Sequence, residues 1–123
     1  MKRRENTIKE DIENVVDDFK VTVGTMRKES PEVTIAFLDL LRNARKEGNL
    51  TVKQKELCCL GIALCIKCEH CIVLHTKSAI EAGATRREIV EICALALMMG
   101  GSQVMPYTSL VFKSCSKFLP KQQ

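Results

Sequence analysis

Two cysteines and two histidines gather within eight residues near the middle of the chain. Cys68 and Cys71 form a Cys-x-x-Cys pair, His70 lies between them, and His75 follows four residues after the second thiol. The 123 residues contain no other histidine. Thiols three residues apart on a helix share one face, at a spacing that lets a disulfide close, and an imidazole one turn further can accept a thiol proton. This segment predicts thiol chemistry.

Two local features favour the thiolate, which is the reactive form of cysteine. We expect Cys68 at the start of a helix, where unpaired backbone N–H groups stabilise negative charge. Cys71 and His75 are four residues apart, so their side chains are neighbours on one helix. The sequence leaves open which sulfur attacks first, since each has one of these features. We expect Cys71 to be the sulfur coupled to the base, and Cys68 to face the reductant.

Glu56 is a candidate partner for His75. It precedes Cys68 by twelve residues, or about 18 Å along an unbroken helix. The polar residues 67–69 predict a bend, and a chain reversal there would bring Glu56 opposite residues 74–78. A carboxylate beside His75 would orient the ring and strengthen it as a base. The alternative is a first-turn glutamate that the helix dipole stabilises.

An iron–sulfur cluster is one competing interpretation. Cys65, Cys68 and Cys71 form a Cys-x-x-Cys-x-x-Cys run, as in bacterial ferredoxins. That pattern requires a further cysteine followed by proline, but here the position holds His75 and then threonine. The flanking residues also favour helix over loop, so a cluster is disfavoured.

Zinc is the second competing interpretation. Its ligands would be Cys68, Cys71 and His75, with His70, Cys65 or Glu56 as the fourth. Structural zinc sites usually lie in knuckle loops with more widely spaced ligand pairs. We therefore expect neither a metal nor another cofactor.

The remaining cysteines lie in apolar helical surroundings. We expect them to pack as small hydrophobic side chains, Cys65 included; they are Cys58, Cys59, Cys65, Cys93 and Cys115. The total of seven is odd, and no apolar signal segment follows the first methionine. These features predict the reducing cytoplasm, where a Cys-x-x-Cys is more often redox-active or metal-binding than a structural crosslink.

The composition favours closely packed helices. Aromatic residues make up 4% of the chain and tryptophan is absent, whereas strands favour aromatic and β-branched residues. We predict one all-α domain over residues 1–123, a bundle of five to six helices with the Cys-x-x-Cys at the start of a central helix. The expected helices cover residues 8–26, 31–47, 51–66, 68–82, 85–99 and 102–118.

Start and stop signals support these bounds. Ser30 and Pro31 begin the second helix, and Thr51 and Thr85 each begin a capping box. We expect the second helix to bury Val33, Ile35, Ala36, Phe37, Leu40, Leu41 and Ala44. The run from Ile92 to Met99 is apolar on all sides, which predicts contacts with other subunits.

Charge and hydropathy argue against two classes of partner. The net charge of +4 is dispersed and no basic stripe alternates with aromatics, so nucleic-acid binding is disfavoured. The longest apolar runs are too short to span a bilayer, so we expect no membrane segment.

Glu56, Cys68-Glu69-His70-Cys71 and His75, followed by Ala79, Gly83 and Glu88-Ile89, resemble the carboxymuconolactone decarboxylase superfamily. The resemblance is closest to its AhpD-like alkylhydroperoxidase branch and covers roughly residues 30–101. It implies an all-α fold and an obligate homo-oligomer, a trimer or a hexamer built as a trimer of dimers.

The resemblance also implies thiol-dependent reduction of hydroperoxides (peroxiredoxin activity) without metal or flavin. Cys68 and Cys71 would cycle between dithiol and disulfide, and Glu56, His70 and His75 map onto the proton-relay positions. A dithiol would restore the pair, carried by a lipoyl-bearing or thioredoxin-like protein.

Other functions stay open at this point. The decarboxylases that name the superfamily generally lack the cysteine pair, which argues against a lactone substrate. A lyase or isomerase would instead use His75 and Glu56 as acid and base. A metal-binding regulatory module and a non-catalytic assembly protein are the remaining alternatives.

Overall fold

The protein is all-helical over the residues that the structure describes. The computed structural model covers residues 2–121, with side chains from residue 11 onward, and confirms the predicted all-α class. The helices are α1 (Lys2–Glu29), α2 (Pro31–Arg45), α3 (Val52–Ile66), α4 (Glu69–Glu81), α5 (Arg86–Gly100), a 3₁₀ segment (Ser102–Tyr107) and α6 (Thr108–Phe118).

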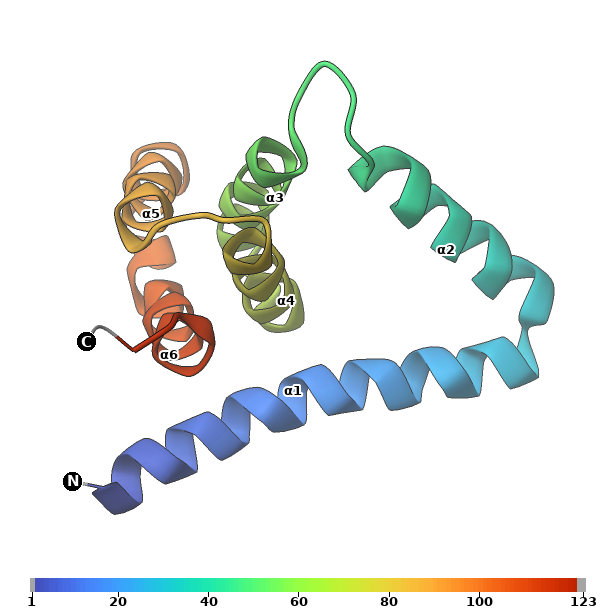
Figure 1. Ribbon diagram of the computed structural model, residues 1–123, viewed down its shortest axis with the longest axis horizontal. Coiled ribbons are helices and arrows are strands. Elements are labelled where there is room, and N and C mark those ends of the chain that lie inside the picture. The colour runs from blue at the N-terminus through green and yellow to red at the C-terminus, as the bar shows by residue number, and fades with distance from the viewer. Residues whose placement is uncertain (1, 122–123) are drawn as a thin grey trace.

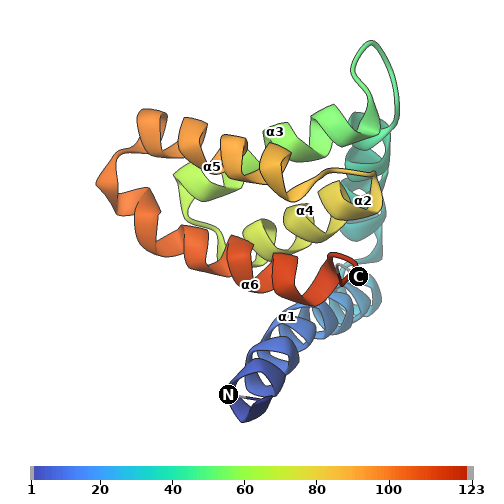
Figure 2. The same cartoon turned by 60° about the vertical axis from the view of Figure 1, so that its left-hand side comes forward.

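Helices α3 to α6 form a bundle around one apolar core (Figures 1 and 2). α3 packs against α4 and α5, and α6 packs against α4. Leu60, Leu64, Ile72 and Ile89 are completely buried. Each such side chain contributes about 1.5–3 kcal/mol through burial. The core therefore holds α3 and α4, which carry the candidate site, in a fixed relative position.

Both predicted capping boxes are present. Thr51 Oγ1 accepts from the Gln54 amide at 3.1 Å, and Gln54 Oε1 accepts from the Thr51 amide at 2.9 Å. Thr85 and Glu88 repeat this arrangement at the start of α5. Each box satisfies N–H groups that a helix start leaves unpaired, so α3 and α5 begin where the sequence predicts.

The predicted bend lies between α3 and α4. Lys67 adopts a left-handed conformation with φ 58°, which is uncommon for a residue other than glycine. The Cys68 amide donates to the Ala63 carbonyl at 3.1 Å, and the Lys67 amide donates to Leu64 at 3.2 Å. These bonds close α3 and reverse the chain directly before the Cys-x-x-Cys pair.

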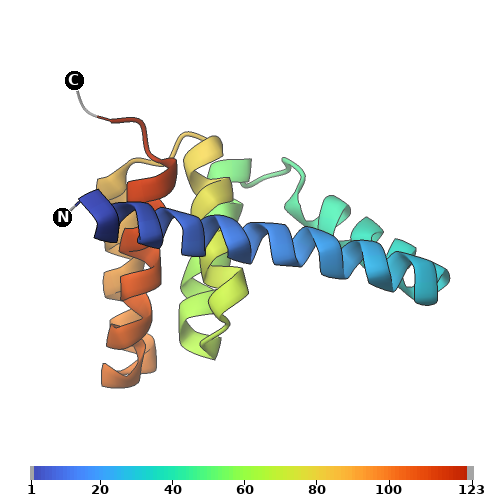
Figure 3. The ribbon, with the colours of Figure 1, turned by 90° about the horizontal axis from the view of Figure 1, so that it is seen from below.

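Helices α1 and α2 form an arm that extends from the bundle. Ile12 and Val16 of α1 pack with Val73 of α4, and the second half of α1 continues past the bundle to α2 (Figure 3). The predicted end of the first helix near residue 26 is wrong, because α1 runs through Gly24 to Glu29. Ile8 is also a predicted core residue, but its side chain is not among those that the structure describes.

The predicted buried face of α2 is also wrong. Only Thr34 is buried in α2, while Val33 is 65% exposed and Leu40 is 63% exposed. The reason is that α2 runs away from the bundle (Figure 1), so none of the described helices covers this face. Leu95, Met98 and Met99 of α5 are likewise exposed.

Two local predictions need correction. Ser30 precedes α2 but its side chain makes no capping bond; instead the Thr34 hydroxyl donates to the Ser30 carbonyl at 2.7 Å. The predicted last helix is divided, because Pro106 lies within the 3₁₀ segment and the α-helix begins at Thr108.

Candidate active site

A disulfide joins Cys68 and Cys71 at the start of α4. Their Cα atoms are 5.2 Å apart, within the range that a disulfide requires. Cys68 is the N-cap residue of α4, and its Sγ accepts from the Cys71 amide at 3.3 Å. The expected placement of Cys68 at a helix start is confirmed.

Glu56 and His75 meet across the interface between α3 and α4. Nδ1 of His75 lies 2.7 Å from Oε2 of Glu56, although the residues are 19 positions apart. The chain reversal at Lys67 produces this approach, as expected from the sequence. Glu56 is only 1% exposed, so the pair lies at the edge of the core.

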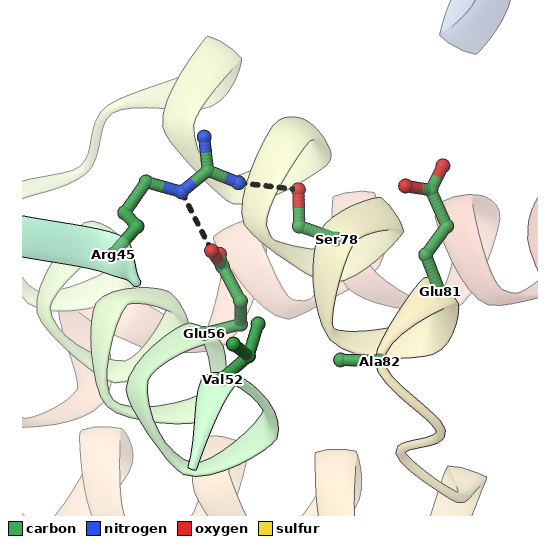
Figure 4. Close-up of a pocket in the computed structure, with 6 residues that line it drawn as sticks. All are labelled: Arg45, Val52, Glu56, Ser78, Glu81 and Ala82. Atoms are coloured by element: carbon green, nitrogen blue, oxygen red, sulfur yellow. Dashed lines mark hydrogen bonds and ion pairs between the residues drawn. The ribbon is translucent and has the colours of Figure 1, made fainter. Parts of the chain in front are cut away.

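Arg45 is a third member of this cluster, and the sequence reasoning missed it. Its Nε donates to Oε1 of Glu56 at 2.6 Å, and an Nη donates to the Ser78 hydroxyl at 3.1 Å. Figure 4 shows the guanidinium reaching from the end of α2 toward α3 and α4. No sequence motif marks it; the only signal is a basic residue in the last turn of a helix that ends shortly before Glu56.

The surroundings keep Glu56 ionised. Burial acts to raise the pKa of this carboxyl, but hydrogen bonds from His75 and Arg45 and the Arg45 charge outweigh it and lower the pKa below 4.5. An ionised carboxylate can only accept. The hydrogen on Nδ1 of His75 therefore faces Glu56, which leaves Nε2 of the neutral ring free to accept a proton.

His75 follows Cys71 by one helical turn, so its ring and the Cys71 sulfur project from the same face of α4. His70 lies differently: it is exposed on the first turn of α4 and takes no part in the hydrogen bonds of Glu56 or His75. The structure therefore brings together Glu56, His75 and the cysteine pair, and leaves His70 at the solvent side.

The model of the carboxymuconolactone decarboxylase family matches residues 31–113. The chain belongs to this family.

Solved structures from the same family are similar in fold. A carboxymuconolactone decarboxylase family protein from Legionella pneumophila superposes with a TM-score of 0.84 at 29% identity, covering 89% of this chain and 98% of the other. A family member from Thermotoga maritima, described with a suggested involvement in antioxidative response, gives a TM-score of 0.75 at 28% identity over 82% of this chain and 86% of its own. An uncharacterised protein from Cupriavidus necator is 27% identical over 99 residues, 80% of this chain and 88% of its own.

The cysteines outside the disulfide of this family member differ from one another in burial. Burial raises the pKa of Cys93 to about 11 and also raises the pKa of Cys115. Both are core residues, as predicted. Cys65 is half-buried and its thiol faces the Ala96 carbonyl at 3.7 Å. The prediction was wrong for Cys58, which is exposed because the adjoining face of α3 is uncovered.

A pocket of about 220 Å³ lies beside the cluster (Figure 4). It is lined by Arg45, Val52, Glu56, Ser78, Glu81 and Ala82. Among the described residues, no group of three or more His, Cys, Asp or Glu side chains is arranged to hold a metal ion. Over the same part of the chain, every helix is too short or too polar to cross a bilayer.

Proposed function

We propose that the protein is a thiol peroxidase that reduces hydroperoxides through a Cys68–Cys71 dithiol–disulfide cycle. The observation that carries the proposal is the disulfide at the start of α4, one turn before a histidine that a buried carboxylate orients. Family membership and the Thermotoga maritima relative, with its suggested antioxidative involvement, support this choice.

In the first step, the free Nε2 of His75 accepts the thiol proton of Cys71. The resulting thiolate attacks a peroxide oxygen, the O–O bond breaks, and a sulfenic acid forms on Cys71. The leaving alkoxide takes the proton from His75 and departs as an alcohol. Glu56 stabilises the transient positive charge on the ring. His70, exposed near the pair, assists proton exchange with solvent.

In the second step, the Cys68 sulfur attacks the sulfenic acid, the disulfide forms and water leaves. An external dithiol, such as a lipoyl-bearing or thioredoxin-like protein, then reduces the disulfide by exchange and is itself oxidised. The proposed cycle uses only thiol and disulfide chemistry and requires no metal or flavin. A reducing compartment such as the cytoplasm would supply the dithiol.

Peroxide consumption tests this function. The reduced protein is supplied with hydrogen peroxide or an organic hydroperoxide and a panel of dithiols. Wild type is compared with Cys68→Ser and Cys71→Ser, and Cys58→Ser serves as the matched control because Cys58 is an exposed thiol outside the pair. We expect turnover in wild type and the control only. Equal rates in all four proteins would refute the proposal.

A second function is supported by the Glu56–His75 pair alone. This pair can transfer protons without thiols, as a lyase or isomerase of the decarboxylase type would require. Such an enzyme would keep its activity in the Cys68→Ser/Cys71→Ser double variant. A test against γ-lactone substrates with that variant separates the two functions.

We also propose that the chain assembles as a homo-oligomer, a trimer or a hexamer. The apolar side chains on the exposed face of α2 and on the end of α5 support this; they are Val33, Ile35, Phe37, Leu40, Leu95, Met98 and Met99. Light scattering of wild type and Leu40→Asp tests it, with Arg42→Asp as a polar control on the same helix. A monomeric wild type would contradict the proposal.

A further inference from the structure

Arg45 lies where it can govern the protonation of the Glu56–His75 pair. Each oxygen of the buried Glu56 carboxylate has one partner: Oε1 accepts from Arg45 at 2.6 Å, and Oε2 faces His75 at 2.7 Å. The two partners come from different helices, α2 and α4. We propose that Arg45 is a positioning residue that acts through Glu56 to hold His75 in the form that accepts the thiol proton. This inference rests on the proposed role of His75 as base.

The burial of Glu56 makes its negative charge costly. A carboxylate that is 1% exposed has lost nearly all its hydration, so it tends to become protonated unless a cation is near. A protonated Glu56 would donate to Nδ1 of His75. The ring hydrogen would then move to Nε2, and His75 could no longer accept a proton from Cys71.

Arg45 opposes that change because its guanidinium stays charged in proteins. Its positive charge makes every protonation step of the carboxylate, imidazole and thiol cluster less favourable. Removing the charge therefore moves each step to higher pH, whichever atom takes the proton. The Arg45 side chain is 42% exposed and borders the pocket, so solvent reduces the effect without abolishing it.

Among the described residues, Arg45 is the one arginine or lysine that forms an ion pair with Glu56. Three ion pairs on the surrounding helices do not involve Glu56: Glu81 with Lys77 on α4, Lys53 of α3 with Glu88 of α5, and Lys117 of α6 with Glu13 of α1. Cys59, on the same helix as Glu56, has its pKa raised by burial and by the Glu56 charge, so its thiol stays neutral.

The position of Arg45 is itself supported. Nζ of Lys55 in α3 donates to the carbonyls of Ala44 at 3.0 Å and Lys46 at 2.7 Å. These bonds fasten the end of α2 to the start of α3. The Ser78 hydroxyl accepts a hydrogen bond from the far side of the guanidinium at 3.1 Å. Contacts among α2, α3 and α4 thus fix the position of the Arg45 charge.

The test follows the alkylation rate of Cys68 and Cys71 in the reduced protein against pH, with peptide mapping to separate them from the other thiols. In Arg45→Met, we expect the acid limb of the profile to move to higher pH by about one unit. Arg45→Lys keeps the charge and should restore the wild-type profile. Arg42→Met is the matched control, because Arg42 lies one turn earlier, is 75% exposed and pairs with Asp39.

The double variant Glu56→Gln/Arg45→Met decides whether Arg45 acts through Glu56. If it does, the shift between Glu56→Gln and the double variant is much smaller than that between wild type and Arg45→Met. An unchanged acid limb in Arg45→Met, or an equal shift in the Glu56→Gln background, would overturn the proposal. Alkylation needs no peroxide turnover, so a shifted profile in a protein that consumes no peroxide would refute the peroxidase and leave the role of Arg45 standing.

Discussion

His75 contacts Glu56 through a hydrogen bond of 2.7 Å between α4 and α3. The contact depends on the reversal at Lys67, which places the two helices antiparallel. Because the Glu56 oxygen occupies Nδ1, only Nε2 of the neutral ring is left to accept a proton. The fold thus selects one nitrogen of the ring for proton transfer, and this selection can be tested by substitution.

Glu56→Gln should slow disulfide formation by peroxide by about 10²-fold. The amide has nearly the same shape but cannot carry the negative charge that stabilises a protonated His75. Stopped-flow measurement of thiol loss in the reduced protein reports the rate. The matched control is Glu81→Gln, which alters a glutamate in the same pocket that pairs with Lys77. A rate equal to wild type in Glu56→Gln would contradict the relay.

Substitution of the two histidines should give unequal effects. We expect His75→Gln to lower the rate by about 10²-fold, because the proton acceptor is removed. His70→Gln should cost less than His75→Gln, because His70 is exposed and makes no bond to Glu56. The same single-turnover assay measures both. An equal loss of rate in the two variants would contradict the assignment of His75, rather than His70, as the proton acceptor.

The stability of the fold should depend on Glu56 in acid. The pKa of Glu56 is lower in the folded protein than its ordinary value of 4.5. Its ionised form therefore stabilises the fold above that pH, and this contribution is lost as pH falls below 4.5 toward the folded pKa. Urea unfolding of wild type and Glu56→Gln over a pH series measures it. A difference in unfolding free energy that stays constant with pH would contradict the prediction.

Two glycines on different helices should respond in opposite ways to alanine. A Cβ at Gly100 would lie 2.5 Å from Val104 Cγ2 and 3.4 Å from the Cys65 sulfur, so Gly100→Ala should destabilise the fold by about 1–3 kcal/mol. At Gly24 the new Cβ would have no atom within 4 Å apart from the glycine, its two chain neighbours and the adjoining backbone of α1. Gly24→Ala should stabilise α1 by about 0.5–1 kcal/mol. Thermal unfolding compares the two, and a neutral Gly100→Ala would show that Val104 can move aside.

The sequence predicted the site better than it predicted the arm. Thr51, Thr85 and the polar turn at Lys67 are local signals, so the helix starts and the Glu56–His75 contact could be inferred from them. Arg45 was missed because its contact depends on how residues 46–51 return the chain to α3. An apolar face such as that of α2 predicts that the helix packs against a partner. It does not predict whether that partner belongs to the same chain.

Cys68 also caps α4, since its sulfur accepts the Cys71 amide hydrogen at 3.3 Å. The same sulfur is an uncharged disulfide atom in the oxidised protein and a thiol or thiolate in the reduced one. A thiolate is the stronger acceptor, so the hydrogen bond from the Cys71 amide differs in strength between the oxidised and the reduced protein. Its proton resonance and solvent exchange rate would therefore serve as a spectroscopic gauge of oxidation state, with no added probe.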